Sequence, residues 1–526
     1  MDDTEPDKAH EGATVDVIHE CFRQRVRENP DAPAVVLGDT RWSYADIDRA
    51  SDAVARSLAE AGVGPGDIVP VVAGRGAVLN TTLLGVLKTG AAYAALDHRW
   101  PPARLRSLTD RLRSGVVVAE EPVADSVDGG DKVCWRTGDW IFPAPADTFA
   151  SPPVSPDDPA AVFFTSGTSG EPKGVLSPHR ATTRLYNPGS FGYFGPGCVM
   201  PNATPVPWDG YTLEVWSVLL SGGCSLVIDV DHLYPALLRG VVRKHGVNTI
   251  WLTSTLFNVL VDEDCAAFAG MSHVMVGGER LSASHVRSFL TTHPSIRLTN
   301  GYGPAENTVF TTTHDIGLTD VDASDIPIGR PVVRTGVHLL DGDRACGPGE
   351  TGEICAAGDG LALGYLDDPV STAEAFVDVD IAGARHRVYR TGDLGHRSPD
   401  GVLHFDGRSD RQLKVRGHRV EPREVEQCAL DHPDVGQAVA LADPGRPNRL
   451  VLFITSPRAG TASTEAVRDV QAHLRARLPD FLLPSRIVAL TELPLNANGK
   501  VDQRRLLADT AARPAAAGTG RPHQPS

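Results

Sequence analysis

Cysteine is scarce in this sequence, and its cysteines stand alone. The chain has 526 residues but only eight cysteines, with no C-x-x-C pair and no histidine at the spacing of a zinc finger. These absences exclude a structural zinc site of the usual kind. Isolated cysteines are also typical of a reduced compartment, so we expect a cytoplasmic protein.

The sequence also lacks an excess of basic residues and long apolar runs. Fifty lysines and arginines stand against 66 aspartates and glutamates, for a formal net charge of −16. This charge disfavours phosphate backbones and anionic lipids, so we expect no nucleic-acid and no membrane partner. No stretch approaches 18 apolar residues, and the acidic start MDDTEPDKAHEGA is unlike a signal or transit peptide.

What the sequence does contain is an alternation of helical and extended patterns. Apolar residues recur at helical spacing between Ile47 and Ala61, and Gly62 ends the pattern. Short apolar runs predict strands at 67–74, 116–119, 226–229, 249–252, 273–276 and 296–299, and helical patterns lie at 77–90, 233–245, 254–262 and 282–293, the last with Ser282 as its N-cap. This order predicts an α/β fold whose parallel sheets are covered by helices on both faces. Ligands of such sheets bind beyond the carboxyl ends of the strands.

Changes in composition suggest the domain boundaries. Beyond about residue 330 the patterns become short strands and turns, and a compact α+β unit begins near Gly407, with strands at 411–415 and 437–442 and helices at 422–431 and 463–478. We predict a disordered N-terminus (1–13), an N-terminal core domain (14–406), a C-terminal subdomain (407–508) and a disordered tail (509–526). Residues 120–160, rich in proline, aspartate and serine, predict an irregular surface excursion.

The stretch FFTSGTSGEPKGVLSPHR (163–180) combines glycines, hydroxyl side chains and a lysine behind an apolar run. We interpret it as a strand, a glycine-rich turn and a helix that begins at Ser177-Pro178. This arrangement is typical of phosphate binding, because glycines let backbone N–H groups approach while hydroxyls and lysine add donors and charge. It is not a Walker A loop, since Pro172 stands where that motif requires glycine. Alone, such a stretch is more often a flexible surface loop.

Other segments follow this loop in a specific order. They are NGYGPAEN (300–307), YRTGD (389–393), GRSDRQLKVRG (407–417) and NANGK (496–500), with the weaker WSYADID (42–48) and LKTGAAYAALD (87–97) before the loop. In this order, over about residues 15–505, the set resembles the adenylate-forming enzymes, specifically the amino-acid adenylation domains of nonribosomal peptide synthesis. The resemblance implies an N-terminal domain with a small β-barrel-like part and a mobile C-terminal domain that carries Lys500.

The resemblance also implies that ATP and Mg²⁺ activate a carboxylate as its adenylate, with release of pyrophosphate. Lys500, Glu306 and Thr165 are then the candidate catalytic residues, and Glu306 is the Mg²⁺ ligand, since that ion favours carboxylate and phosphate oxygens. Lys500 would bridge the substrate carboxylate and the α-phosphate. Tyr302 would stack on adenine, and Asp393 would accept hydrogen bonds from the ribose. The candidate ATP-binding residues are Thr165, Ser166, Gly167, Thr168, Ser169, Lys173, Asn300, Gly301, Tyr302, Gly303, Ala305, Asp393, Arg408 and Lys500.

Two further features concern the second half-reaction of the family. Asp410 matches the hinge about which the C-terminal domain turns, and VRGHR (415–419) matches the loop that lines the tunnel for a phosphopantetheine arm. The basic residues around this loop are explained equally well by a surface strand paired with local carboxylates and by carrier docking. Three departures from the family pattern, Ser169 and Ala305 in place of threonine and Ala95 in place of proline, remove no charge.

The segment VPWDGYTLEVW (206–216) bears on the substrate. It places Asp209 where amino-acid-activating members hold the α-ammonium group. A buried carboxylate without a partner is costly, so Asp209 favours amines over simple acids. The candidate substrate-binding residues are Asp209, Gly210, Leu213, Thr255, Met275, Gly277, Gly301, Val309 and Phe310. Apart from Asp209 none is charged, so we expect valine, 2-aminobutyrate or a similar small aliphatic amino acid, with threonine kept open by Thr255.

Several alternatives stay open at this point. An acyl- or aryl-CoA ligase would share the fold and act on an acid without an amine, and a non-catalytic nucleotide-binding or scaffold protein would share parts of the motif set. Only a short tail follows Lys500. We therefore expect a free-standing enzyme of antibiotic or related natural-product biosynthesis that loads a separate phosphopantetheinylated carrier protein.

Overall fold

The computed structural model describes most of the chain. The described residues are 16–128, 132–138, 141–144, 147–165, 172–186, 192, 194–230, 233–322, 325–381, 383–409, 413–415, 418–443, 446–457, 463–494, 501–503 and 505–507. The two predicted disordered ends lie outside the described residues. So do six predicted site residues, namely Ser166, Gly167, Thr168, Ser169, Asp410 and Lys500.

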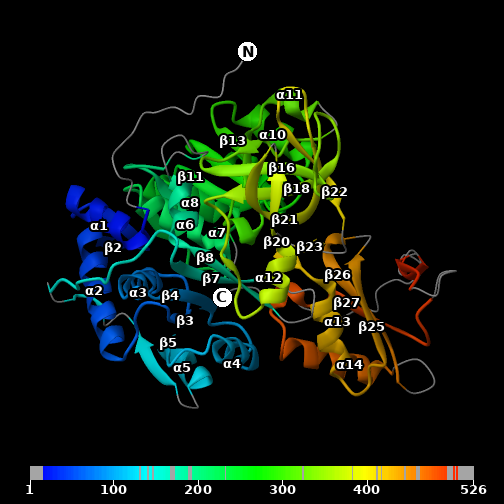
Figure 1. Cartoon of the computed structure of the whole chain (residues 1–526), viewed down its shortest axis with the longest axis horizontal. Helices are drawn as coiled ribbons and strands as arrows, with labels where there is room; N and C mark the ends of the chain where they lie inside the picture. Colours follow the sequence, from blue (N-terminus) through cyan, green and yellow to red (C-terminus); the bar gives the residue numbers. More distant parts are fainter. Residues whose placement is uncertain are drawn as a thin grey trace.

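A seven-stranded sheet forms one layer of the large N-terminal part (Figure 1). Its strands, in spatial order, are β19 (Gly364–Tyr365), β8 (Lys173–Pro178), β7 (Pro159–Thr165), β4 (Ala92–Asp97), β3 (Ile68–Ala73), β5 (Val116–Glu120) and β6 (Val133–Thr137). The helices beside it are α1 (Ile18–Glu28), α2 (Tyr44–Glu60), α3 (Ala77–Lys88), α4 (Pro102–Arg111) and α5 (Glu121–Val127). Val71 faces a core shared with α1, α2 and α3, whereas Val72 faces a core shared with α4 and α5. Helices therefore cover both faces, as the apolar strands predict.

A second sheet of five strands carries the remaining parallel strands. Its order is β11 (Thr249–Thr253), β12 (His273–Gly277), β13 (Arg297–Tyr302), β14 (Thr312–Asp315) and β15 (Arg330–Pro331). Helices α8 (Pro235–His245), α9 (Ser254–Asp264) and α10 (Ala283–Thr292) share one apolar core with it. A smaller sheet lies alongside and contains β2 (Thr40–Ser43), β1 (Pro33–Leu37), β10 (Cys224–Val227) and β9 (Val199–Asn202). Because β11, β12 and β13 are parallel, their carboxyl ends lie at one edge.

An antiparallel sheet forms the small barrel-like part. It contains β17 (Arg344–Ala345), β16 (Thr335–Asp341), β18 (Gly352–Gly358), β21 (Ala384–Arg397) and β20 (Phe376–Ile381), with β22 (Leu403–Arg408) paired to β21. The short helix α12 (Pro369–Ala375) precedes β20, whereas α11 (Leu318–Val321) connects β14 to β15 of the five-stranded sheet. Asp393 of β21 lies directly opposite Arg408 of β22, which places these two predicted ATP-binding residues side by side.

The C-terminal part packs beside the large part and forms its own small unit (Figure 1). A hairpin of β23 (Leu413–Val415) and β24 (His418–Val420) is followed by α13 (Pro422–Leu430), β25 (Gln437–Asp443), β26 (Arg446–Thr455), α14 (Thr464–Arg475) and β27 (Arg486–Leu490). Its core is separate from those of the large part. The predicted α/β fold, with a barrel-like part and a small C-terminal α+β domain, is confirmed.

The glycine-rich stretch is not followed directly by a helix, which corrects the prediction. Strands β7 and β8 are antiparallel, and Thr165 lies opposite Lys173. The segment 166–171 thus joins two strands of a hairpin. Ser177 is buried in β8, and α6 (His179–Thr183) begins only after Pro178. The prediction was wrong because a Ser-Pro pair fits the end of a strand as well as the start of a helix.

A smaller expectation is also wrong, and another is confirmed in position only. The segment 120–160 contains α5 and β6, and β6 extends the seven-stranded sheet parallel to β5. Ser282 occupies the N-cap position of α10, but its side chain makes no capping hydrogen bond. Its hydroxyl instead lies 2.6 Å from Nδ1 of His285, three residues on.

Candidate active site

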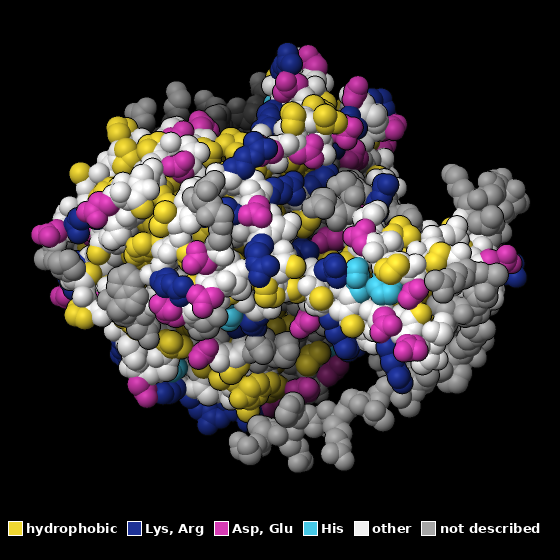
Figure 2. Space-filling model, turned by 90° about the horizontal axis from the view of Figure 1, so that it is seen from below, with side chains coloured by type: hydrophobic (Ala, Val, Ile, Leu, Met, Phe, Trp, Pro, Cys, Tyr) yellow, Lys and Arg dark blue, Asp and Glu magenta, His cyan; other side chains and the backbone are white. Residues whose placement is uncertain are grey.

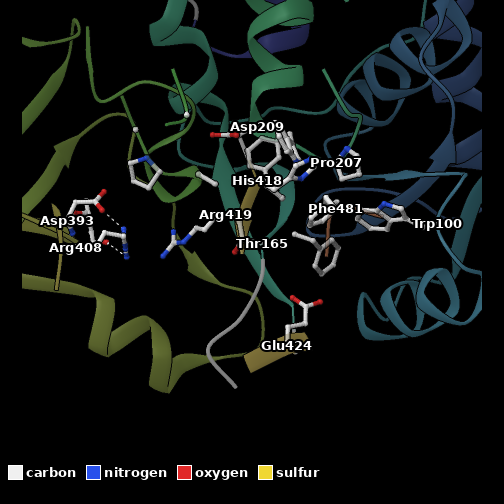
Figure 3. Close-up of a pocket in the computed structure, with 18 of the residues that line it drawn as sticks. Trp100, Thr165, Pro207, Asp209, Asp393, Arg408, His418, Arg419, Glu424 and Phe481 are labelled. Atoms are coloured by element: carbon white, nitrogen blue, oxygen red, sulfur yellow. Dashed lines mark hydrogen bonds and ion pairs between the residues drawn. The ribbon is translucent and has the colours of Figure 1, made fainter. Parts of the chain in front are cut away.

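A pocket lies between the large part and the C-terminal part (Figure 3). Thr165 enters it from the end of β7, Asp209 from the first residue of α7 (Asp209–Thr212), and Asp393 from β21. The lining residues are Trp100, Arg104, Phe163, Phe164, Thr165, Pro207, Trp208, Asp209, Gly278, Gly303, Pro304, Ala305, Thr391, Asp393, Arg408, His418, Arg419, Glu424 and Phe481. Six of the predicted residues, from segments far apart in the sequence, thus meet at one pocket.

The predicted ribose site is a preformed polar cluster. Asp393 is buried, and the Tyr302 hydroxyl donates to its Oδ2 at 2.6 Å. The Arg408 guanidinium forms an ion pair with Oδ1 of Asp393 and donates to the Thr391 carbonyl at 3.2 Å. Burial and the neighbouring Asp393 hold the pKa of Tyr302 well above its usual range, so the phenol stays a donor. These bonds fix the Asp393 carboxylate at the pocket wall before any ligand binds.

Four of the described residues predicted to bind ATP do not line the pocket, namely Lys173, Asn300, Gly301 and Tyr302. The side-chain amide of Asn300 donates to the carbonyl of Pro327 at 2.7 Å. The ammonium of Lys173 lies 4.7 Å from the ring centre of Tyr365. Gly303 and Ala305, in contrast, lie in the wall directly after β13.

Glu306, the predicted Mg²⁺ ligand, is buried behind this wall and already holds a cation. Arg419 of β24 donates to its two carboxylate oxygens at 2.9 and 2.7 Å, and Tyr365 donates to Oε1 at 2.8 Å. Burial opposes the charge on Arg419, but Glu306 and the phenols of Tyr389 and Tyr365 keep its pKa well above the usual range. Because Lys173 contacts the same Tyr365 ring, the predicted phosphate lysine and the predicted metal carboxylate share one neighbour.

Asp209 presents a carboxylate in a nearly apolar setting. Its Oδ1 accepts a hydrogen bond from the Gly210 amide at 2.9 Å, and its Oδ2 accepts one from the Val309 amide at 2.8 Å. Burial raises the pKa of Asp209. The two amides lower this pKa, whereas the charge of Glu306 raises it. A bound ammonium group would compensate the buried negative charge, so the site is suited to a cationic ligand group.

Apolar predicted substrate residues lie together beside Asp209. Leu213, Met275, Val309 and Phe310 are all buried and belong to one cluster. Gly277 and Gly301 are direct partners on β12 and β13. A Cβ on Gly277 would lie 2.0 Å from the Gly301 carbonyl oxygen, and one on Gly301 would lie 2.2 Å from the Phe310 ring, so both positions require glycine for space.

One neighbour of this cluster, Trp251, was missed from the sequence. Trp251 packs edge-on against Phe310, with ring centres 5.3 Å apart, and its indole would lie 3.4 Å from a Cβ on Gly210. The hydroxyl of Thr255 donates to Glu279 at 2.6 Å. The sequence signal for Trp251 was its place in a predicted strand, which marks a core residue rather than a site residue.

The contacts from the C-terminal part were also missed. The His418 ring stacks on the Phe481 ring, with ring centres 3.8 Å apart. It lies edge-on to the Trp208 ring, with ring centres 3.9 Å apart. Arg104 of α4 pairs with Glu424 of α13 at 2.9 Å. Figure 3 shows Arg419 reaching into the middle of the pocket, with Asp393 and Arg408 on one side and Trp100 and Phe481 on the other. The only sequence signal for these residues was the VRGHR segment.

The face of the molecule drawn in Figure 2 carries charges of both signs. On the face shown in Figure 2, acidic, basic and apolar side chains are interspersed among the described residues. In the part of the chain that the structure describes, no cluster of three or more histidine, cysteine, aspartate or glutamate side chains could hold a metal ion. No helix among those residues is long and apolar enough to cross a membrane.

Two protein-family models match the chain. The AMP-binding enzyme family matches residues 22–366, and the AMP-binding enzyme C-terminal domain matches residues 424–500. Among characterised proteins, malpibaldin synthetase of Mortierella alpina is 35% identical over 520 residues, which is 96% of this chain and 9% of that protein. Surfactin synthase subunit 3 of Bacillus subtilis is 32% identical over 494 residues, or 92% of this chain and 38% of that protein.

Solved structures give the same result. PA1221, an NRPS protein containing adenylation and PCP domains, superposes with a TM-score of 0.82 at 31% identity, covering 95% of this chain and 98% of that one. The same protein in holo form, bound to a vinylsulfonamide inhibitor, gives a TM-score of 0.84 at 32% identity, covering 94% and 84%. The chain thus spans nearly all of PA1221, but only 9% of malpibaldin synthetase and 38% of the surfactin synthase protein.

Proposed function

Because the chain belongs to the AMP-binding enzyme family, as an adenylate-forming ligase of the nonribosomal peptide synthetase type, we propose that it activates a small aliphatic amino acid with ATP. The products of this step would be the aminoacyl adenylate and pyrophosphate. The aminoacyl group would then pass to the phosphopantetheine thiol of a separate carrier protein. The single observation that carries the choice of an amino acid is the Asp209 carboxylate, held by two amides beside an apolar cluster.

The nucleotide side of the proposal rests on Asp393 and Arg408. Their ion pair at the pocket wall leaves carboxylate lone pairs for the ribose hydroxyls. Thr165 at the end of β7 and Lys173 at the start of β8 flank the hairpin segment proposed to hold the phosphates. Lys500, outside the described residues, would bring its charge to the α-phosphate when the C-terminal part turns.

Magnesium fits the residues that are present. Glu306 is buried, and its carboxylate pairs with Arg419 in this conformation. When Arg419 moves away, the Glu306 carboxylate requires another positive partner. A carboxylate beside a triphosphate is the setting that Mg²⁺ favours, and the ion would supply charge neutralisation of the phosphates. The chain's own contribution is to hold Glu306 in place through the Tyr365 hydroxyl.

The side of the pocket formed by the C-terminal part supports thiol transfer as the second step. In this conformation the aromatic side chains of Trp100, Trp208, His418 and Phe481 line the pocket, and Arg419 occupies the Glu306 carboxylate. Adenylation requires Glu306 to be available, so this domain arrangement suits the later step. An elongated arm could then enter along the aromatic side chains. PA1221 contains adenylation and PCP domains in one chain, which supports a carrier of that kind as the acceptor.

The size of the substrate side chain follows from the apolar cluster. Leu213, Met275 and Phe310 share one buried cluster and Trp251 packs against Phe310, which supports a branched aliphatic side chain of three or four carbons as the group that this region accepts. An extra methylene in such a pocket changes binding by only about 1–3 kcal/mol, so we expect valine and 2-aminobutyrate to compete. Threonine is less favoured, because the Thr255 hydroxyl already donates to Glu279.

A pyrophosphate-exchange screen tests the proposal. Purified protein is incubated with ATP, Mg²⁺ and labelled pyrophosphate, together with each of the twenty amino acids, 2-aminobutyrate, or carboxylic acids that lack the amine, such as 3-methylbutanoate and benzoate. We expect exchange with valine or 2-aminobutyrate above all others. Exchange with only the amine-free acids would show an acyl- or aryl-activating ligase instead. No exchange with any acid would favour a non-catalytic nucleotide-binding protein.

A further inference from the structure

One fully buried arginine lies outside the predicted site, and no motif points to it. Arg184 follows α6 in a short helical turn (Arg184–Tyr186) and is 0% exposed. No carboxylate of the described residues lies within ion-pair distance of it. Burial lowers the pKa of Arg184 to about 9, so it still carries its charge at neutral pH. A buried cation without an ionic partner is costly, so its remaining contacts must compensate for that cost.

Those contacts all converge on one turn. Nη2 of Arg184 donates to the carbonyl oxygens of Asn307, Thr308 and Phe310 at 2.5, 3.0 and 3.0 Å. The hydroxyl of Ser177, on β8, lies 3.0 Å from the hydroxyl of Thr308 and adds a second hydrogen bond to the turn. The Arg184 guanidinium thus holds the turn of residues 307–310 through its backbone carbonyl oxygens. This contact does not depend on which side chains the turn carries.

The turn needs such a constraint because its backbone is strained. Thr308 and Val309 have φ angles of 46° and 67°, in the left-handed region. Both are β-branched, and non-glycine residues of this kind avoid that region at a cost of about 1–3 kcal/mol each. Among the described residues they are the only two neighbouring non-glycine residues with positive φ. Strain of this kind persists only where the surrounding contacts enforce it.

The strained conformation has a consequence at the site. It directs the Val309 amide to Oδ2 of Asp209 at 2.8 Å, and it presents the Val309 and Phe310 side chains to the apolar cluster. If the turn relaxed, Asp209 would lose one of its two amide donors, and the wall of the side-chain pocket would move. Glu306 lies just before the turn, but its carboxylate is held separately by Tyr365.

We propose that Arg184 is a positioning residue for the amino-acid substrate: its guanidinium locks the 307–310 turn so that the Val309 amide orients the Asp209 carboxylate toward the ammonium group. The inference rests on the proposed function, because it assigns that role to Asp209. Arg184 itself touches neither the nucleotide site nor the described lining of the pocket.

A nearby glycine offers an independent means of disturbing the same contact. A Cβ on Gly360 would lie 2.4 Å from Nη2 and 2.5 Å from Nε of Arg184, and 2.5 Å from Oδ1 of Asn307 in the turn that Arg184 contacts. Gly360 does not have a left-handed φ angle, so alanine is compatible with its backbone. Gly360→Ala therefore displaces the guanidinium without removing the charge, whereas Arg184→Gln removes the charge and Arg184→Lys keeps it with a compact ammonium group.

The test measures KM values in pyrophosphate exchange for the preferred amino acid, for ATP, and for the 2-hydroxy analogue of that amino acid. We expect Arg184→Gln to raise the amino-acid KM by about 10-fold or more, as loss of a charged hydrogen bond does. The KM for ATP should change less than about 2-fold, and the preference for the amine over the hydroxyl analogue should fall. Arg184→Lys should retain part of that preference, and Gly360→Ala should resemble Arg184→Gln.

A matched arginine elsewhere serves as the control. Arg397 donates to the carbonyls of Gly401 and Val337 at 3.3 and 3.1 Å, in the barrel-like part and away from the pocket. Arg397→Gln should leave the preference for the amine unchanged. An unchanged amino-acid KM in Arg184→Gln would overturn the inference. So would an equal rise of the amino-acid KM and the ATP KM in Arg184→Lys and in Gly360→Ala. The two milder variants decide the question if Arg184→Gln does not fold. Failure of the proposed function is distinguishable, because the unaltered enzyme would then show no amino-acid-dependent exchange at all.

Discussion

Arg419 of the C-terminal part forms a two-oxygen ion pair with Glu306 of the large part, at 2.9 and 2.7 Å. The carboxylate is 1% exposed, and the two residues are 113 positions apart in the sequence. In this arrangement a side-chain cation occupies the carboxylate proposed for Mg²⁺. If Glu306 holds Mg²⁺ as proposed, metal binding and this domain position would exclude each other, and the pair would couple the ligand state of the pocket to the position of the C-terminal part.

The first prediction concerns this pair. Arg419→Ala leaves Glu306 buried and unpaired in the present domain arrangement, which destabilises that arrangement by about 3–5 kcal/mol. We expect the Mg²⁺ concentration for half-maximal pyrophosphate exchange to fall, while transfer to a carrier thiol slows by about 10-fold or more. Arg423→Ala is the control. Arg423 is exposed on α13 and is one of the basic residues around the loop 415–419 that contains Arg419. Equal effects of the two variants would show that only the overall charge of the segment matters.

The second prediction concerns the ribose site. Asp393→Asn keeps the size of the side chain but removes the charge that pairs with Arg408 and accepts the Tyr302 hydroxyl. We expect the KM for ATP in the exchange assay to rise at least about 10-fold, because a charged hydrogen-bond network is lost. The KM for the amino acid should hardly change. A shift confined to the amino-acid KM would contradict the assignment of Asp393 to the nucleotide.

Much of this architecture could be predicted from the sequence, but its long-range contacts could not. The helix between Ile47 and Ala61 follows from local periodicity, which α2 confirms with bounds Tyr44–Glu60. The ordered motifs also indicated that Asp393 and Asp209 serve one pocket. The Arg419–Glu306 pair depends on where one domain stands relative to the other, and no local pattern records that position.

Backbone strain was equally invisible in the sequence. Thr308 and Val309 are residue types that favour extended backbone, so their left-handed conformation contradicts their own propensities. It arises from the tertiary contact with Arg184, which precedes the turn by more than a hundred residues. The Ser177-Pro178 error has the opposite cause, because there a local signal was interpreted without the strand pairing that overrides it.

The third prediction separates the two half-reactions through Lys500, a residue outside the described part of the chain. Lys500→Ala should slow adenylate formation by about 100-fold or more, since a charge aligned with the transition state is lost. Thiol transfer from a supplied aminoacyl adenylate should be largely spared. Both rates are measured on the same preparation with a phosphopantetheinylated carrier. Equal damage to both steps would indicate that Lys500 is structural.

The fourth prediction concerns stability in acid. Burial lowers the pKa of His19 to about 2 and that of His179 to about 4, and the two rings lie 5.9 Å apart. Both are neutral in the folded protein at pH 7. The unfolded chain binds protons at these positions below about pH 6.5, so stability is full above that pH and falls as the pH drops toward the folded values.

His179→Gln checks this effect, because its amide stays neutral throughout. Between pH 7 and pH 5 each buried histidine should cost about 2 kcal/mol of unfolding free energy. The variant should therefore lose less stability than the unaltered protein over this interval, by about that amount in denaturant titrations. A parallel decline of the two proteins would place the acid sensitivity elsewhere.

The most direct test of the central claim is a crystal structure of the enzyme with a non-hydrolysable analogue of valyl adenylate. The account predicts the ribose hydroxyls on Asp393, the ammonium group on Asp209, and the phosphate mimic beside Thr165. An analogue whose ammonium group lies away from Asp209, or whose ribose lies away from Asp393, would contradict the claim that one pocket joins the nucleotide to an amino acid.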